Sequence, residues 1–529
     1  MRARSGNFAE GIGAAALAAA LLLTGCPGSD SRERAARPLS ARPNVLWIVW
    51  DTVRADHLGL YGHSRPTTPF LTEWSKDARV FEDALSTAGY TLPAHASMFT
   101  GLYPSEHCTH NDNARLDDSY ITIAELLKGA GYRTFLYSAN PHIAAHPAGN
   151  FAQGFDQEEH PWSPQWAEQA LRLVRAKVPL EDHSTELPQI LAAAREGRAT
   201  LAPENIKAAG EIAKTATLQW LEASDKGQPF FIFLNYMEAH RPYIPPRRFR
   251  NQLLPPADVI RSYRVDRSWS RMWEFTFGLR EYSDDDLMLT AATYDATLLE
   301  LDELLRDLLK ALRESGHLDD TIVILTADHG DQLGEHHMLD HQYSVYQTLL
   351  HVPLIILAPG RLAPGRDPSP VMSFDLFPTL LELTGVAAPP DLRSQAVSLL
   401  SPRQDRVRFA EDPAMTSIGI AQILPQYPGW DPRSFQRRLR TLVIGAHKLI
   451  WGSDGRRELY DLSADPMETR DLIRDQPELA AKLGAELDRY FETLARCKMP
   501  SHPHQRQLTA EQQELLKGLG YLDDDAPKP

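Results

Sequence analysis

The chain has 529 residues, 43% of them hydrophobic and 24% charged, and its formal net charge is -15 because 70 acidic residues outnumber 55 Lys and Arg. This composition excludes a wholly disordered chain, a coiled coil and a collagen-like fibre. The negative charge argues against nucleic acid as a main partner. An anionic substrate would therefore need a locally positive site, made by a metal ion or by clustered histidines.

The N-terminus has the features of a targeting segment. Arginines precede an apolar run, Ala14–Leu23, which is too short to span a bilayer and is typical of a signal peptide. The run leads into Leu-Thr-Gly-Cys, which resembles a bacterial lipoprotein box and implies lipidation of Cys26. We expect a signal peptide over 1–26, a flexible tether over 27–42, and a lipid anchor at a bacterial membrane facing the periplasm or exterior. The alternative is an ordinary secretory signal that contains a cysteine.

The mature chain alternates apolar, β-branched runs with helical patterns. Asn44–Trp50 predicts a buried strand. Similar runs lie at 133–139, 230–236, 321–327 and 352–357, and helical patterns lie at 121–128 and, on one long apolar face, at 294–312. This alternation predicts an α/β fold with a mostly parallel sheet flanked by helices. In such folds ligands bind at the carboxyl ends of the strands.

Other segments divide the chain further. Residues 160–225 have a polar helical pattern, as in an insertion or flank, and 241–285 are rich in Arg, Pro, Trp and Tyr, which predicts a long loop at the site mouth. Beyond residue 400, two apolar runs flank a hairpin signal at Ser453–Arg456, and a helix follows over about 477–495. We therefore expect a catalytic domain at 43–400 and a smaller α+β subdomain at 401–529, with the acidic residues 523–525 in a solvated tail.

The three cysteines cannot form a disulfide framework. If Cys26 is lipidated, only Cys108 and Cys497 remain. They would pair if the fold made them neighbours, and two free thiols are an equal alternative.

Acidic and histidine side chains follow several predicted strands. Asp51 ends the first strand, Asp328 and His329 end another, and His240 follows a third. A carboxylate at a strand end can hold a metal ion, although it can equally cap the next helix. A lone histidine is most often structural. Each of these signals is weak by itself.

A threonine precedes a short helical pattern. In Thr91-Leu92-Pro93-Ala94-His95, proline suits a first helical turn, and Gly101 suits the helix end. A helix N-terminus binds anions and favours an alkoxide, and a metal ion would lower the pKa of the hydroxyl further. The simpler alternative is that Thr91 only caps the helix.

Together these segments resemble, in order and spacing, the sulfatase family of the alkaline phosphatase superfamily. The motifs are Asp-Thr-Val-Arg-Ala-Asp-His-Leu-Gly, Pro-x-His-Ala-Ser-x-Phe-Thr-Gly and Ala-Asp-His-Gly-Asp-x-Leu-Gly-Glu-His, followed by Ser373–Leu380, Glu458–Leu462 and Asp465-Pro466. The resemblance covers about residues 43–525. It implies the alkaline-phosphatase-like fold and a metal-dependent hydrolase of sulfate or phosphate esters.

The resemblance also implies roles for particular residues. The metal ligands would be Asp51, Thr91, Asp328 and His329, with Thr91 as the nucleophile. Contacts to the sulfate or phosphate group, or to the leaving oxygen, would come from His95, His240 and His341. Asn140 and His142 lie near the place where the family has a Lys and His pair.

Two departures from the family change the expected chemistry. Sulfatases oxidise a Cys or Ser to formylglycine, but threonine carries a methyl group on Cβ and cannot give that aldehyde, so Thr91 would attack directly. The family's second Asp is Thr52 here, and His329 supplies a nitrogen. One metal ion is expected, with Zn²⁺ or Mn²⁺ favoured over Ca²⁺. His336 and His337 would be the spare candidates for a second.

Three functions fit these features. The first is a hydrolase of sulfate or phosphate esters that forms a covalent intermediate on Thr91. The second is a transferase that moves a phospho-headgroup, such as phosphoethanolamine, to a lipid or glycan. The third is a non-catalytic protein that binds anions or glycans. The sequence does not decide between sulfate and phosphate esters. Four arginines would either bind an anionic glycan or simply be solvated: Arg241, Arg247, Arg248 and Arg250.

Overall fold

The computed structural model describes residues 38–110, 113–144, 149–177, 207, 209–223, 227–390, 392–413 and 418–497. The predicted signal peptide with Cys26, most of the tether and the acidic residues 523–525 lie outside this part of the chain. Within it, every helix is too short or too polar to cross a bilayer.

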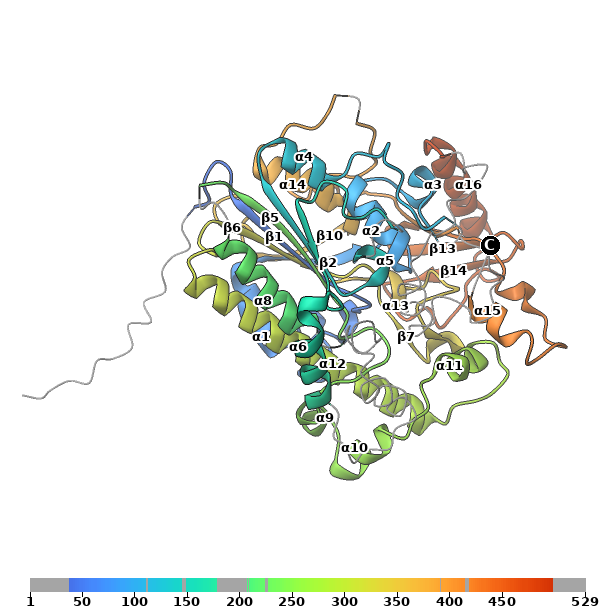
Figure 1. The fold of residues 1–529 in the computed structure, drawn as a ribbon. Helices are drawn as coiled ribbons and strands as arrows, with labels where there is room; N and C mark the ends of the chain where they lie inside the picture. The colour runs from blue at the N-terminus through green and yellow to red at the C-terminus, as the bar shows by residue number, and fades with distance from the viewer. Residues whose placement is uncertain are drawn as a thin grey trace, which may run out of the picture.

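A mixed, mostly parallel sheet of eight strands forms the centre of the molecule (Figure 1). Five neighbouring strands run parallel to one another: β6, β1, β5, β3 and β4. On the other side of the sheet β2 is parallel to β10, and β9 runs antiparallel to both β6 and β2. Their order across the sheet is β10 (Gly365–Met372), β2 (Arg79–Leu85), β9 (Leu354–Leu357), β6 (Thr321–Thr326), β1 (Asn44–Trp50), β5 (Phe230–Tyr236), β3 (Arg133–Ser138) and β4 (Gln157–Glu159).

Helices cover both faces of this sheet (Figure 1). One face carries α1 (Pro69–Trp74), α6 (Ala167–Lys177), α8 (Ala209–Glu222) and the long α12 (Asp284–Glu314). The other carries α2 (Thr91–Thr100), α4 (Ile123–Gly129) and α14 (Leu376–Thr384). Shorter helices are α3 (Pro104–His107), α5 (Pro141–Ala144), α9 (Arg247–Leu253), α10 (Pro256–Ser262), α11 (Trp269–Thr276), α13 (Gln347–Leu350) and α15 (Ile418–Ile423).

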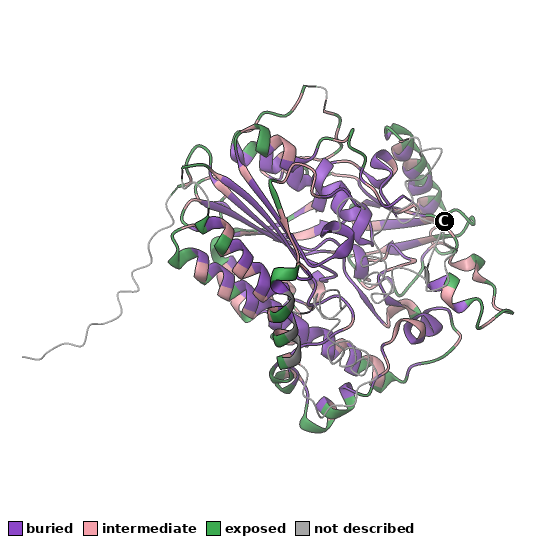
Figure 2. Ribbon diagram, viewed as in Figure 1, coloured by how far each residue is buried: buried purple, intermediate pink, exposed green. Residues whose placement is uncertain are grey.

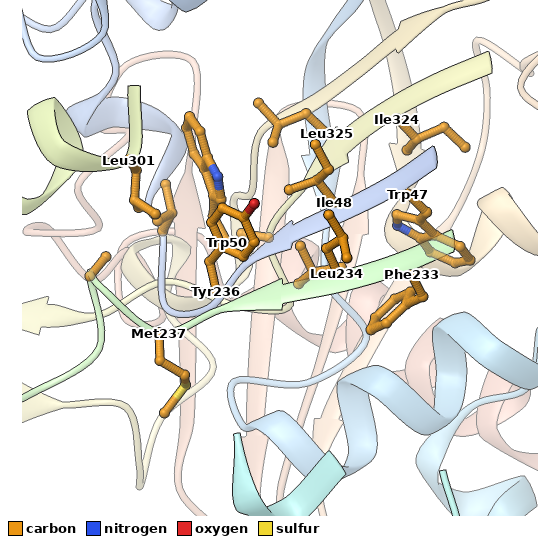
Figure 3. Close-up of a cluster of buried hydrophobic side chains, with 14 of the residues drawn as sticks. Trp47, Ile48, Trp50, Phe233, Leu234, Tyr236, Met237, Leu301, Ile324 and Leu325 are labelled. Atoms are coloured by element: carbon orange, nitrogen blue, oxygen red, sulfur yellow. The ribbon is translucent and has the colours of Figure 1, made fainter. Parts of the chain in front are cut away.

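The strands are buried because both faces of the sheet are covered (Figure 2). Side chains of successive residues point to opposite faces, so Trp47 meets Phe233 and Phe99 on the α2 side, with ring centroids 5.5 and 6.1 Å away. Trp50 and Leu301 of α12 belong to the same buried cluster (Figure 3). This continuous apolar core fixes the strand ends that carry the polar residues.

The C-terminal part forms a smaller α+β unit. Its antiparallel sheet is β11 (Arg408–Asp412), β12 (Leu439–Ile444), β13 (His447–Gly452) and β14 (Arg457–Asp461), covered by α16 (Pro477–Thr493). A disulfide joins Cys108, just after α3, to Cys497, just after α16. The structure thus selects pairing from the two alternatives that the sequence left open.

The predicted α/β fold with a C-terminal subdomain is confirmed, and the principal difference lies at 241–285. This segment holds the three helices α9, α10 and α11, so the prediction of one long loop was wrong. Each of these helices has only seven or eight residues, which is about two turns and too short for a clear apolar period. The predicted polar helical segment at 160–225 contains α6 and α8, with 178–206 outside the described residues.

Candidate active site

The candidate site lies at the carboxyl ends of four adjacent strands. β6, β1, β5 and β3 are neighbours and all run parallel, so their last residues meet at one edge of the sheet. Asp51 follows β1, Asp328 follows β6, Asn140 follows β3, and His240 lies four residues beyond β5. The topology therefore gathers polar residues that are up to 277 positions apart, from Asp51 to Asp328.

Asp51, Asp328 and His329 form a buried cluster whose ligand atoms all lie within 4.8 Å of one another. Asp51 Oδ2 accepts hydrogen bonds from the amides of Asn140 (2.9 Å) and Asn235 (3.2 Å). Asp328 Oδ1 accepts from the backbone N–H of His329 (2.9 Å) and of Thr52 (3.2 Å). Within the described part of the chain Asp51 Oδ1 accepts no hydrogen bond, and Asp328 Oδ2 lies 3.3 Å from His329 Nε2 and 3.5 Å from His95 Nδ1.

The electrostatics of this cluster favour a cation. Burial, reinforced by the charge of Asp328, raises the pKa of Asp51 from about 3.8 to about 7. Burial likewise raises the pKa of Asp328 to about 7. Two buried carboxylates side by side cost free energy unless a positive charge compensates them. The donor set of two carboxylate oxygens and one nitrogen fits a divalent metal ion.

His329 presents a lone pair to this cluster. Its Nδ1–H donates to the carbonyl of Gly330 at 2.8 Å, so in the neutral ring Nε2 is unprotonated. Burial lowers the pKa of His329, which keeps that neutral form. Gly330 makes this turn feasible, because a Cβ there would lie 2.0 Å from the backbone oxygen of Thr348.

Thr91 is the first residue of α2 and points into the same cluster. Its Oγ1 lies 3.3 Å from His329 Nε2 and 3.5 Å from the amide nitrogen of Asn140. The sequence placed Thr91 just before the helix, whereas in the structure Tyr90 is the cap residue and makes no side-chain capping bond. The hydroxyl thus lies beside the positive end of the helix dipole.

His95 lies one turn further along α2, where its ring is enclosed by aromatic side chains. The rings of Phe99, Phe151 and Phe233 lie edge-on to it at centroid distances of 6.4, 6.4 and 6.0 Å. Its Nδ1 lies 3.1 Å from the carbonyl oxygen of Thr91, and burial lowers its pKa to about 3, so the ring is neutral. The same Nδ1 lies 3.5 Å from Asp328 Oδ2, so the ring connects the start of α2 to the carboxylate cluster.

His240 and His341 form a pair next to His329. Their Nε2 atoms are 3.1 Å apart, and the ring centroids of His341 and His329 are 4.6 Å apart. His240 Nδ1–H donates to the carbonyl of Arg241 at 2.6 Å, so the proton between the two rings comes from His341 in the neutral pair. Burial first, and then the charge of His341, lower the pKa of His240, and burial lowers that of His341 to about 3. Both rings are therefore neutral, and one proton lies between them.

Asn140 and His142, which the sequence placed only loosely, belong to the site. Asn140 donates to Asp51 and lies within reach of Thr91, as described above. His142 Nε2 lies 3.2 Å from the hydroxyl of Tyr90. The signal that could have found Asn140 was its place directly after a buried parallel strand.

The arginines of the 241–250 segment separate into different roles. Arg241 is buried, approaches Asp340 at 3.5 Å and stacks on Trp269, so it lies beside His341. Arg250 is also buried, but it donates to Ser262, Thr293 and the carbonyl of Tyr243 in the protein core. Arg248 pairs with Glu303 at the surface, and no described contact connects Arg247 with the site.

A second group of potential ligands is an ion-pair cluster. Asp295 Oδ1 lies 2.6 Å from His57 Nδ1, and its Oδ2 lies 3.2 Å from His63 Nε2. Arg65 donates to the same Oδ2 at 2.7 Å, so this carboxylate is already neutralised. The spare candidates His336 and His337 belong to neither described group: His336 stacks on Tyr346, and His337 lies against Phe275.

Comparisons with known proteins agree with this geometry. The sulfatase family model matches residues 43–386, and a model of the C-terminal part of N-sulphoglucosamine sulphohydrolase matches residues 334–495. Arylsulfatase K of Bos taurus is 26% identical over 502 residues, covering 89% of this chain and 86% of that protein. N-acetylglucosamine-6-O-sulfatase of Bacteroides thetaiotaomicron is 23% identical, with 86% of each chain covered. The crystal structure of phosphonate monoester hydrolase of Agrobacterium radiobacter has the same fold, with a TM-score of 0.66 at 21% identity over 87% of this chain and 98% of that one.

Proposed function

Because the chain belongs to the sulfatase family of ester hydrolases, we propose that it is a metal-dependent hydrolase that attacks sulfate or phosphate esters through the hydroxyl of Thr91. One observation carries this proposal. Thr91 Oγ1 lies 3.3 Å from His329 Nε2, at the start of a helix and beside the two buried carboxylates of the same cluster. A threonine that only capped the helix would not need these neighbours.

The residues that would hold the metal ion are Asp51, Asp328 and His329, with Thr91 as a fourth ligand. A divalent ion bound there would lower the pKa of the threonine hydroxyl and compensate the charge of the transferring group. The imidazole nitrogen favours Zn²⁺ or Mn²⁺ over Ca²⁺. The direct route replaces formylglycine chemistry, because the β-methyl group of threonine prevents its oxidation to an aldehyde.

The residues of this chain support two steps. In the first, Thr91 reacts as the alkoxide, after its hydroxyl proton has passed to solvent, and Oγ1 forms a bond to sulfur or phosphorus while the bond to the leaving oxygen breaks. His240 or His341 gives its proton to that leaving oxygen as a general acid. In the second, water cleaves the Thr91 ester, Oγ1 leaves again as the alkoxide, and the same pair takes back a proton from the water. Asn140 holds Asp51 throughout, and Arg241 adds a fixed positive charge beside the histidines.

The substrate class follows from the charge of the site and from the relatives. The chain as a whole is acidic, whereas the site would combine a bound divalent ion with the N–H groups of the His240–His341 pair and with Arg241, so it suits an anionic ester. Two relatives are named as sulfatases, arylsulfatase K and N-acetylglucosamine-6-O-sulfatase. A sulfated glycan is therefore the first substrate to try, and a phosphate or phosphonate ester is the second because of the threonine.

The proposed location is the cell envelope, with a lipid on Cys26 as the anchor. The disulfide between Cys108 and Cys497 supports this proposal, because disulfides persist in oxidising compartments such as the periplasm. A chain that stayed in a reducing cytosol would not keep such a bridge.

The experiment that tests the function is a hydrolysis panel on the mature chain. The substrates are 4-nitrophenyl sulfate, 4-nitrophenyl phosphate and its bis-ester, each with Zn²⁺, Mn²⁺ or Ca²⁺. Thr91→Val is the isosteric variant without a hydroxyl, and Thr91→Ser is its matched control because it keeps one. We expect hydrolysis that Thr91→Val abolishes and Thr91→Ser retains in part. Equal activity in Thr91→Val would exclude this nucleophile, and transfer to an added alcohol without hydrolysis would favour the transferase.

A further inference from the structure

A buried lysine lies directly behind the turn that carries His240. Lys207 precedes α8 and is only 1% exposed. Its Nζ donates to the carbonyl of Met237 at 2.7 Å and, in a shorter contact, to the carbonyl of His240. These two carbonyls belong to the two ends of the turn after β5, and the backbone N–H of His240 closes the turn on Met237 at 3.2 Å. Figure 3 shows Met237 at the end of this strand.

Lys207 belongs to a small network of buried charges. Glu238, in the same turn, accepts a hydrogen bond from the backbone N–H of Gly210 at the start of α8 (2.9 Å). Lys177 of α6 pairs with Glu300 of α12 at 2.5 Å and donates to the carbonyl of Lys207. Helices α6, α8 and α12 cover one face of the sheet (Figure 1), so the network connects this helical layer to the strand end.

The burial of Lys207 is not explained by a contribution to the stability of the fold alone. A buried ammonium loses its hydration, and burial lowers the pKa of Lys207 to about 7 against the opposing effect of Glu238. Buried ion pairs often contribute less to stability than apolar residues of the same size. The ammonium of Lys207 does donate hydrogen bonds to two backbone carbonyls, which no apolar side chain could do.

We propose that Lys207 is a positioning residue for His240: it holds the Met237–His240 turn and thereby sets the ring of His240 against His341. This proposal rests on the proposed function, in which His240 or His341 protonates the leaving oxygen. The ring is sensitive to the turn because its Nδ1 is hydrogen-bonded to the next backbone carbonyl, that of Arg241, at 2.6 Å. A shift of the turn therefore moves the ring nitrogen that faces His341.

The test compares esters whose leaving groups differ in acidity, using the mature metal-loaded enzyme. A general acid matters most for a poor leaving group, so its misplacement gives a selective loss. For Lys207→Met we expect little change in kcat with the 4-nitrophenyl ester and a loss of about 10–100-fold with the 4-methoxyphenyl ester. Lys207→Arg keeps the charge and should restore part of the loss.

A double-mutant cycle shows whether Lys207 acts through His240. In a His240→Gln background, which has already lost the acid, Lys207→Met should add no further selective loss. Lys448→Met is the matched control, because Lys448 is equally buried and donates to the carbonyl of Val345 at 2.6 Å. It should lower stability without changing the dependence on the leaving group.

The outcomes separate this inference from the proposed function. If His240→Gln shows no selective loss, the acid of the proposed mechanism is wrong, and the inference falls with it. Suppose instead that His240→Gln lowers kcat selectively for the poor leaving group. If Lys207→Met then lowers kcat equally for all esters, or lowers it as much in the His240→Gln background as in the wild type, only the positioning role is refuted. If Lys207→Met and Lys207→Gln both fail to fold, the role of Lys207 is structural, and the inference is overturned.

Discussion

Replacing Asp51 by asparagine tests the claim that this buried carboxylate exists to hold a cation. The substitution keeps the shape of the side chain and removes its charge. Asp51 is fully buried, and its Oδ1 has no hydrogen-bond partner in the described part of the chain. An asparagine can still accept, through its carbonyl oxygen, the hydrogen bonds that Asn140 and Asn235 donate. In a protein stripped of metal, the substitution should therefore stabilise the fold.

The magnitude follows from the shifted pKa of Asp51. Burial and the charge of Asp328 raise that pKa from about 3.8 to about 7. The folded protein then binds this proton more tightly than the unfolded chain, so the destabilisation is absent below about pH 4 and complete above about pH 7. About three units at 1.36 kcal/mol each give a ceiling of about 4 kcal/mol at pH 8, and about 1.5 kcal/mol at pH 5.

The assay is urea unfolding of the wild type and Asp51→Asn, with a chelator and with Zn²⁺, at pH 5 and pH 8. With the chelator, we expect the variant to be more stable than the wild type, by more at pH 8 than at pH 5. With Zn²⁺, only the wild type should gain stability. Asp295→Asn is the control, because Asp295 is equally buried but paired with Arg65, so its pKa is lowered and the loss of its charge should destabilise by about 3–5 kcal/mol. An Asp51→Asn variant that is less stable in chelator at pH 8, or that still responds to Zn²⁺, would refute the reasoning.

Three further predictions follow from single contacts. Cys108→Ser, which removes the bridge to Cys497, should lower the free energy of unfolding by about 2–5 kcal/mol, as chemical denaturation under non-reducing conditions would show. The ammonium of Lys448 lies 2.6 Å from the buried carboxylate of Glu468, so Lys448→Met leaves this carboxylate without its partner. The substitution should lower the free energy of unfolding by about 3–5 kcal/mol. An unchanged free energy of unfolding would mean that the pair is not formed. Asn140→Ala removes a donor to Asp51 and should weaken Zn²⁺ affinity about 10–100-fold, which equilibrium dialysis measures, and an unchanged affinity would contradict the site.

The strand-end residues could be predicted from the sequence because two simple rules place them. Continuous apolar runs identify buried parallel strands, and the carboxyl ends of such strands share one edge. Asp51 and Asp328 directly follow such runs, so their proximity needed no knowledge of the rest of the fold. The alternation of strands and helices gave the fold class in the same way.

Other features depend on packing that a linear pattern does not carry. Strand β10 (Gly365–Met372) contains two prolines and lies at the edge of the sheet, so it lacks the apolar run of a central strand. The ring of His95 is directed by three phenylalanines from different elements. Cys108 and Cys497 are 389 positions apart, and only the docking of α16 brings them together. The contact of Lys207 with the turn after β5 joins residues about 30 positions apart, and the sequence pattern did not indicate it.

The most direct test of the central claim is to trap the covalent intermediate on Thr91. The metal-loaded enzyme is mixed with the most reactive 4-nitrophenyl ester, quenched within the first turnover and digested, and the peptide that contains Thr91 is analysed by mass spectrometry. The account predicts that this peptide gains the mass of one sulfo group (SO3) or one phosphoryl group, localised to Thr91, and that Thr91→Val gives neither the adduct nor turnover. Full turnover in Thr91→Val, or an adduct on a different residue, would contradict it.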